Sequence, residues 1–198
     1  MIATVRGMEP YGRFLNVIDV EATCWDGPVP PGQANEIIEI GLCVIDWERG
    51  ERVARHQIMV RPDRSRVSPF CTELTGHTQE DVDRGVGFRE ACAALERDHH
   101  ARSRPWASWG DYDRKQFQGQ CGAARVRYPF GSHHTNAKLT YSQSHGLSRR
   151  FGMAGALRHT GLPLEGRHHN GADDAWNIAA LILDIAARDA WPAPFQPT

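Results

Sequence analysis

The stretch Phe14-Leu-Asn-Val-Ile-Asp-Val-Glu-Ala-Thr23 carries two carboxylates, Asp19 and Glu21, in a largely apolar run. Its apolar and β-branched residues predict a buried strand. Residues two apart on a strand point to the same face, so the two carboxylates are expected to be neighbours. Adjacent like charges on a buried strand are costly unless something compensates them. The pair therefore indicates a site for a divalent cation.

The rest of the chain predicts an α/β domain in which strands come first and helices follow. Further strands are expected at 36–46, 52–60 and 107–109, and the first three strands predict an antiparallel meander. Helical spacing of apolar residues then predicts a helix that ends near Arg97, another that Asp113 opens, and later ones over 147–157 and 178–185. This order describes a layered domain built on one mixed sheet.

Bulk properties exclude some classes of protein. With 198 residues and 40% apolar content, the chain suits one domain, expected over 14–190 between a tail at 1–13 and a proline-rich tail at 191–198. A net charge of −1 excludes a polybasic protein that coats nucleic acid. The sequence contains no apolar run of signal-peptide or membrane-spanning length, and its five cysteines are scattered. We therefore expect no membrane partner and a cytoplasmic location.

A second acidic segment reads His168-His-Asn-Gly-Ala-Asp-Asp174. Asp174 lies four residues before Ile178 and so continues the apolar stripe of the last helix toward the sheet. Asp173 is rotated by about 100° and suits a helix N-cap or a first-turn acid. Asp174 is therefore the candidate functional acid, with His169 as its partner in the preceding loop.

Asp113 is a third candidate because it lies where a strand is followed by a helix, a common place for sites in α/β proteins. Together, the four carboxylates call for about two divalent cations, and oxygen ligands suit Mg²⁺ or Mn²⁺ better than zinc. Two such ions stabilise the attacking and leaving oxygens of phosphoryl transfer. A neutral histidine could take a proton from the attacking water. The residues thus indicate metal-dependent phosphodiester hydrolysis.

These segments, in this order, resemble the DEDDh exonucleases of the DnaQ-like (RNase H-like) superfamily, and specifically their Eri-type branch. The resemblance runs from Phe14 to Ile185. His77 departs from it, because the branch usually has a β-branched aliphatic residue there. The segments that carry the resemblance are 19–24, 68–83, 108–113, 161–166 and 169–174.

The resemblance implies an RNase H-like fold, with a central mixed five-stranded sheet flanked by helices. It implies a 3′→5′ exonuclease that releases nucleoside 5′-monophosphates from nucleic-acid 3′ ends with two Mg²⁺ or Mn²⁺ ions. By the same resemblance, His169 is the general base, the metal ligands are Asp19, Glu21, Asp113 and Asp174, and the contacts to the terminal nucleotide are Ala22, Thr23, Phe70 and Tyr112.

We expect single-stranded or frayed ends as the substrate, with RNA favoured over DNA. Two alternatives stay open at this point: a non-catalytic module that binds nucleic-acid ends, and an oligoribonuclease-like enzyme restricted to short oligonucleotides. The sequence is compatible with a monomer and with a homodimer. It assigns no role to the region 118–135, which lacks a strong motif.

Overall fold

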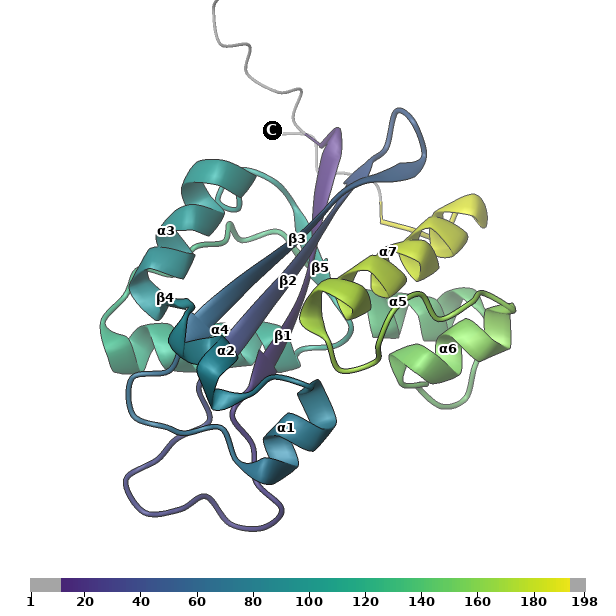
Figure 1. Ribbon diagram of the computed structural model, residues 1–198. Coiled ribbons are helices and arrows are strands. Elements are labelled where there is room, and N and C mark those ends of the chain that lie inside the picture. The colour runs from purple at the N-terminus through teal and green to yellow at the C-terminus, as the bar shows by residue number, and fades with distance from the viewer. Residues whose placement is uncertain (1–11, 193–198) are drawn as a thin grey trace, which may run out of the picture.

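A computed structural model describes residues 12–192 of the chain. Most of the two predicted tails, 1–13 and 191–198, lies outside these residues. The described part is a three-layer α/β/α structure with one mixed sheet in the middle (Figure 1). The predicted fold class is therefore confirmed.

Six strands form the sheet of the described residues, in the order β4-β3-β2-β1-β5-β6. The neighbours β1–β2 and β2–β3 are antiparallel, whereas β1–β5, β5–β6 and β3–β4 are parallel. The prediction of five strands was wrong in number. The extra pairing arises at the sheet edges, where strands of two and three residues are too short to show a period in the sequence. The strands are β1 Phe14–Ala22, β2 Ile37–Asp46, β3 Glu51–Arg61, β4 Val86–Gly87, β5 Trp106–Ser108 and β6 His134–Asn136.

Helices cover both faces of the sheet: α5, α6 and α7 lie on one side, and α3 and α4 on the other (Figure 1). The helix predicted over 147–157 begins only at Met153, because Leu147 and Phe151 pack on the core from a non-helical loop. The described helices are α1 Pro69–Thr75, α2 Gln79–Asp83, α3 Phe88–His99, α4 Tyr112–Ala124, α5 Ala137–Ser144, α6 Met153–Thr160 and α7 Gly171–Ala187.

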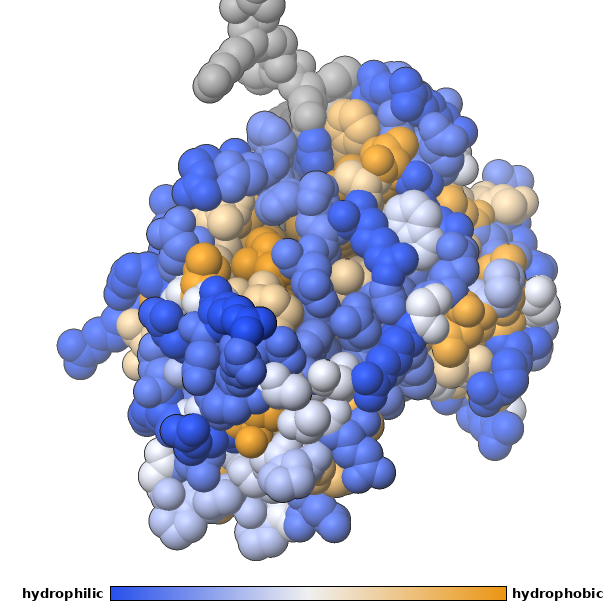
Figure 2. Space-filling view, viewed as in Figure 1, coloured by the Kyte–Doolittle hydropathy of each residue, from blue (hydrophilic) through white to orange (hydrophobic). Residues whose placement is uncertain are grey.

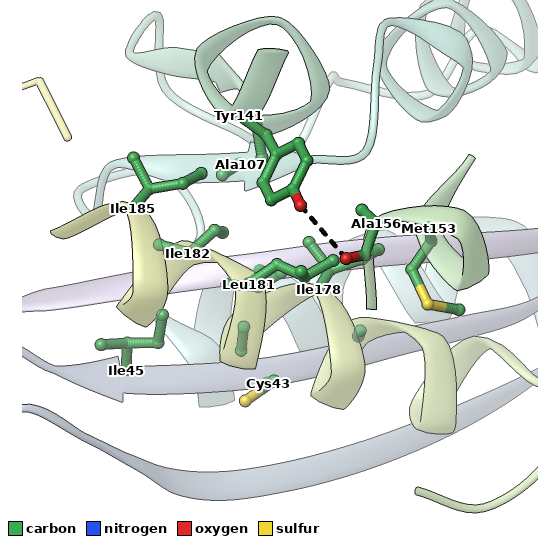
Figure 3. Close-up of a cluster of buried hydrophobic side chains, with 14 of the residues drawn as sticks. Cys43, Ile45, Ala107, Tyr141, Met153, Ala156, Ile178, Leu181, Ile182 and Ile185 are labelled. Carbon is green, nitrogen blue, oxygen red and sulfur yellow. Dashed lines mark hydrogen bonds between the residues drawn. The ribbon is translucent and has the colours of Figure 1, made fainter. Parts of the chain in front are cut away.

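The longest of these helices, α7, packs its apolar stripe on the centre of the sheet. Figure 3 shows Ile178, Ile182 and Ile185 among side chains from β2, α5 and α6. The Tyr141 hydroxyl of α5 donates to the carbonyl of Ala156 in α6 at 3.1 Å and ties these two helices together. Burial of each such aliphatic side chain contributes about 1.5–3 kcal/mol, so α7 is held firmly where its first turn meets β1 and β2.

The surface of this structure is mainly polar. On the face seen in Figure 1, hydrophobic residues reach the surface in small separate groups among hydrophilic ones (Figure 2). Within residues 12–192, no helix combines the length and apolarity needed to cross a bilayer.

Candidate active site

β1 presents its residues alternately to the two helical layers. Leu15 and Val17 belong to the core under α7, whereas Ile18 and Val20 belong to the core under α3 and α4. The same alternation predicts that the side chains of Asp19 and Glu21 share the α7 side of the sheet. The strand packs against helices on both faces, so Glu21 is buried and Asp19 is partly buried when the chain folds.

Two helices bring the other two predicted acids to this place. Oxygen atoms of Asp19, Glu21 and Asp174 lie within 4.8 Å of one another, which places the first turn of α7 over β1. Asp113, in the first turn of α4, accepts a hydrogen bond of 3.0 Å from the backbone N–H of Val20, between the two acids of β1. Four carboxylates from three distant segments thus meet at one end of the sheet.

The neighbouring acid Asp173 has a different environment. Its carboxylate pairs with Arg55 of β3 and accepts a hydrogen bond from the backbone N–H of Arg167 at 2.6 Å. The N-cap of α7 is Asn170, whose side chain accepts the N–H of Asp173. Of the two roles expected for Asp173, the structure therefore gives it that of a first-turn acid.

The electrostatics of the cluster show that the protein compensates its negative charges only in part. Burial, and then the charges of the other acids, raise the pKa of Asp19 well above its ordinary range and that of Glu21 to about 8. Burial likewise raises the pKa of Asp113 to about 6 and raises that of Asp174. A divalent cation would stabilise the ionised form of these acids, so the cluster suits a cation site.

Two histidines lie beside Asp174 in the loop that precedes α7. Their rings stack with centroids 3.9 Å apart. His168 Nδ1 lies 2.9 Å from the Asp174 carboxylate, which also accepts the backbone N–H of His169 at 3.1 Å. The contact between His168 and Asp174 was not predicted from the sequence spacing, because His169, between them, has a left-handed backbone conformation (φ 62°). Burial, together with the charges of His168 and Arg167, lowers the pKa of His169.

These groups line one open cavity of about 400 Å³, which also includes the predicted nucleotide contacts Ala22 and Tyr112. Tyr112 is 55% exposed and donates a hydrogen bond from its hydroxyl to Asn35 at 3.1 Å. Two further lining residues, Cys24 and Trp109, lie in segments that carry the family resemblance. Three others were not singled out from the sequence, because small and apolar side chains are common in cores and loops: Leu74, Gly152 and Met153.

The other two predicted nucleotide contacts lie outside the cavity lining. Thr23 is fully buried; its hydroxyl donates to the carbonyl of Ala34 and accepts the N–H of Glu36, both at 2.9 Å. Its side chain therefore stabilises the loop after β1 and does not face the cavity. Phe70 is 39% exposed on α1, the helix that also carries the lining residue Leu74.

Comparison with known proteins identifies the family. Residues 17–182 match the family model RNase_T, described as "Exonuclease". The chain belongs to this family. It is a DEDDh 3′–5′ exonuclease, and the resemblance seen in its motifs is confirmed.

Several relatives share about three residues in ten with this exonuclease. It is 30% identical to the 3′-5′ exonuclease Snipper of Drosophila melanogaster, over 90% of this chain and 70% of Snipper. It is 29% identical to 3′-5′ exoribonuclease 1 of Rattus norvegicus, over 92% of this chain and 56% of the relative. The chain thus spans little more than half of the rat protein.

The fold agrees with that of a solved relative. The crystal structure of the nuclease domain of 3′hExo bound to rAMP, described as a DEDDh family member, superposes with a TM-score of 0.82 at 28% identity. The alignment covers 92% of this chain and 96% of that domain. The DEDDh exonucleases are typically metal-dependent, and the four clustered carboxylates described above are a donor set of the hard oxygen type that Mg²⁺ and Mn²⁺ prefer.

Proposed function

We propose that this exonuclease degrades single-stranded or frayed RNA in the 3′→5′ direction and releases nucleoside 5′-monophosphates. The observation that carries the proposal is the convergence of four carboxylates and His169 on one cavity. The preference for RNA is supported by relatives named exoribonucleases and by the related nuclease domain that binds rAMP. Five free cysteines support a reducing compartment such as the cytoplasm.

We further propose that the cofactor is a pair of Mg²⁺ or Mn²⁺ ions held by Asp19, Glu21, Asp113 and Asp174. When bound, the ions would neutralise the charge that develops on the phosphate and make the water nucleophilic. The raised pKa values of these acids support the assignment, because a bound cation would favour the ionised form that burial and the neighbouring charges disfavour.

His169 is proposed as the general base. Its lowered pKa keeps the imidazole neutral at pH 7, so that a ring nitrogen can accept a proton. In the proposed reaction, water gives this proton to His169 while its oxygen bonds to phosphorus. The bond between phosphorus and the 3′-oxygen of the penultimate nucleotide breaks, and the terminal nucleotide leaves with its 5′-phosphate. The hydrogen bond from the His169 backbone to Asp174 holds the loop in place.

The terminal nucleotide is proposed to lie against Tyr112 and the backbone at Ala22. Both residues line the cavity, and the exposed Tyr112 ring offers a face on which a base can stack. Phe70 is proposed as a second aromatic contact from α1, for a nucleotide that extends beyond the lined cavity.

The test uses single-stranded RNA labelled at its 5′ end, with a free or a phosphorylated 3′ end, beside the matching DNA, in Mg²⁺. We expect stepwise shortening of the RNA with a free 3′ end and release of 5′-monophosphates. Asp19→Asn should reduce the rate by about a hundredfold or more, since several kcal/mol of charge stabilisation is lost. Asp83→Asn, which changes an exposed acid of α2, is the matched control.

Other results would support the alternatives. Retention of the RNA by the wild-type protein without shortening would indicate an end-binding module. Shortening of di- to tetranucleotides alone would indicate an oligoribonuclease-like enzyme. Equal rates on RNA and DNA would contradict the proposed preference for RNA.

A further inference from the structure

β2 carries another buried carboxylate, Glu39, to which the sequence motifs assign no role. It is fully buried and lies directly opposite Glu21 in the β1–β2 register. Four donors surround it. Oε1 accepts Gln57 Nε2 at 2.8 Å and the backbone N–H of Ala172 at 3.0 Å. Oε2 accepts the backbone N–H of Gly171 at 2.9 Å, and His77 Nε2 lies 2.5 Å from it.

These contacts favour the ionised form of Glu39. Burial alone would raise its pKa, but the hydrogen bonds from His77, Gly171 and Gln57 outweigh burial, and the pKa is lowered. An ionised carboxylate only accepts hydrogen bonds, so His77 Nε2 carries the proton in this pair. Two oxygens offer about four lone-pair directions, and all of them have partners. Glu39 therefore has no free lone pair for a metal, in contrast to Asp19 and Glu21.

Two of the four donors are the first backbone N–H groups of α7. At a helix N-terminus these groups lack partners within the helix and favour a negative charge. The backbones also meet closely here: a Cβ added to Gly41 would lie 1.8 Å from the carbonyl oxygen of Gly171. The first turn of α7 therefore packs directly on β2, and the hydrogen bonds to Glu39 set its position relative to the strand. Asp174 follows in the same turn.

His77 links this contact to the segment after α1. It is 8% exposed, and its outer side borders a surface cavity of about 310 Å³. Because the His77 backbone N–H also donates to the Thr75 hydroxyl at the end of α1, the helix that carries Leu74 is joined through His77 and Glu39 to the start of α7. The surface cavity beside His77 is lined by Gln57, Met59, His77, Asp81 and Arg84.

We propose that Glu39 is a positioning residue for the nuclease reaction, which anchors the first turn of α7 so that Asp174 faces Asp19 and Glu21. His77 and Gln57 hold the carboxylate in this orientation. The inference rests on the proposed function for its kinetic readout only, because the position of α7 can also be measured in the metal-free protein.

The test compares Glu39→Gln, His77→Gln and His77→Ala. An amide has one acceptor oxygen, so the first variant cannot accept all four donors, whereas glutamine at position 77 keeps a donor where Nε2 was. Glu36→Gln is the matched control, because Glu36 is also buried and accepts backbone N–H groups at 63–65, away from α7. The measurements are amide hydrogen exchange without metal, Mn²⁺ binding by calorimetry, and kcat and KM on RNA.

For Glu39→Gln we expect faster exchange at residues 171–174, with the second half of α7 unchanged. We also expect Mn²⁺ affinity and kcat lower by about ten- to a hundredfold, the usual range for groups that orient metal ligands, with KM unchanged. His77→Ala should show a smaller loss, which His77→Gln largely restores. Glu36→Gln should leave exchange at residues 171–174 and Mn²⁺ binding as in the wild type.

Three results would overturn the inference: wild-type exchange and affinity in Glu39→Gln, the same changes in Glu36→Gln, or the loss of one bound Mn²⁺ from the stoichiometry, which would make Glu39 a ligand. A wild-type protein that releases no nucleotide would contradict the proposed function instead, and exchange and metal binding would still decide the role of Glu39.

Discussion

Neutralising one acid of the active site should stabilise the metal-free protein. Glu21 is 8% exposed, and burial followed by the charges of Asp174, Glu39 and Asp113 raises its pKa from 4.5 to about 8. The folded protein therefore keeps a proton that the unfolded chain releases at pH 4.5. Because the native state binds more protons, the free energy of unfolding falls as the pH rises from 4.5 to 8. Glu21→Gln removes this dependence.

The magnitude follows from the width of that window. Each pH unit contributes about 1.4 kcal/mol, so the cost of Glu21 is on the order of 3 kcal/mol at pH 7 and close to zero below pH 4.5. For a chain of this size, 3 kcal/mol corresponds to a rise in Tm of about 6–12 °C. We therefore expect Glu21→Gln to be more stable than the wild type by this amount at pH 7, and to lose nuclease activity.

The assay is thermal unfolding in EDTA at pH 4.5, 6, 7 and 8, with Glu73→Gln as the control for an exposed acid on α1. The Tm difference between Glu21→Gln and wild type should grow with pH. The free energy of unfolding of the control should stay within about 0.5 kcal/mol of the wild type at every pH. Saturating Mg²⁺ should stabilise the wild type more than the variant and narrow the difference. A variant that is equal to or less stable than wild type at pH 7 in EDTA would refute the electrostatic argument.

Three further predictions concern single groups around the cavity. Asp174→Asn should abolish RNA cleavage, whereas Asp173→Asn should keep most activity and lower Tm, because its carboxylate holds Arg55; equal activity losses would contradict the register of α7. If His169 is the general base as proposed, its neutral form is the active one, and kcat should fall with decreasing pH, with a midpoint below 6.5 because the pKa is lowered. His169→Ala should reduce kcat by about 10²–10⁴ and flatten that limb of the pH profile. Charge reversal of Arg149 and Arg150, which are exposed just before the cavity-lining start of α6, should raise KM for long RNA but not for a dinucleotide; equal KM changes on both would exclude a backbone contact.

The sequence predicts those parts of the site that depend on the regular repeat of side-chain directions along one strand or one helix. A period of two places Asp19 and Glu21 together, and a period of 3.6 separates Asp174 from Asp173. Both interpretations agree with the positions in the structure. Asp113 was found from its position between a strand and a helix, and the family motif supported it; no period alone would single it out.

Other parts depend on contacts between elements and left no local signal. Glu39 reads as an ordinary strand residue, and its role emerges only when α7 lies against β2. The contact between His168 and Asp174 depends on a single left-handed residue. The family resemblance implies a nucleotide contact for Thr23, whereas in the structure the loop after β1 buries its hydroxyl. The short edge strands form only because a finished sheet offers them a partner.

The place of α7 in the chain has a consequence for synthesis. The site needs Asp19 and Glu21 from the first strand and Asp174 from the last described helix, with 152 residues between Glu21 and Asp174. Until α7 leaves the ribosome, α5 and α6 are the only described helices available for the face of the central sheet that α7 covers, and Asp174 is missing from the four-carboxylate cluster. If Asp174 is a metal ligand as proposed, a nascent chain that lacks α7 is expected to have no nuclease activity. We expect nuclease activity to begin only after α7 has packed on the sheet, so that completion of the fold and completion of the active site coincide.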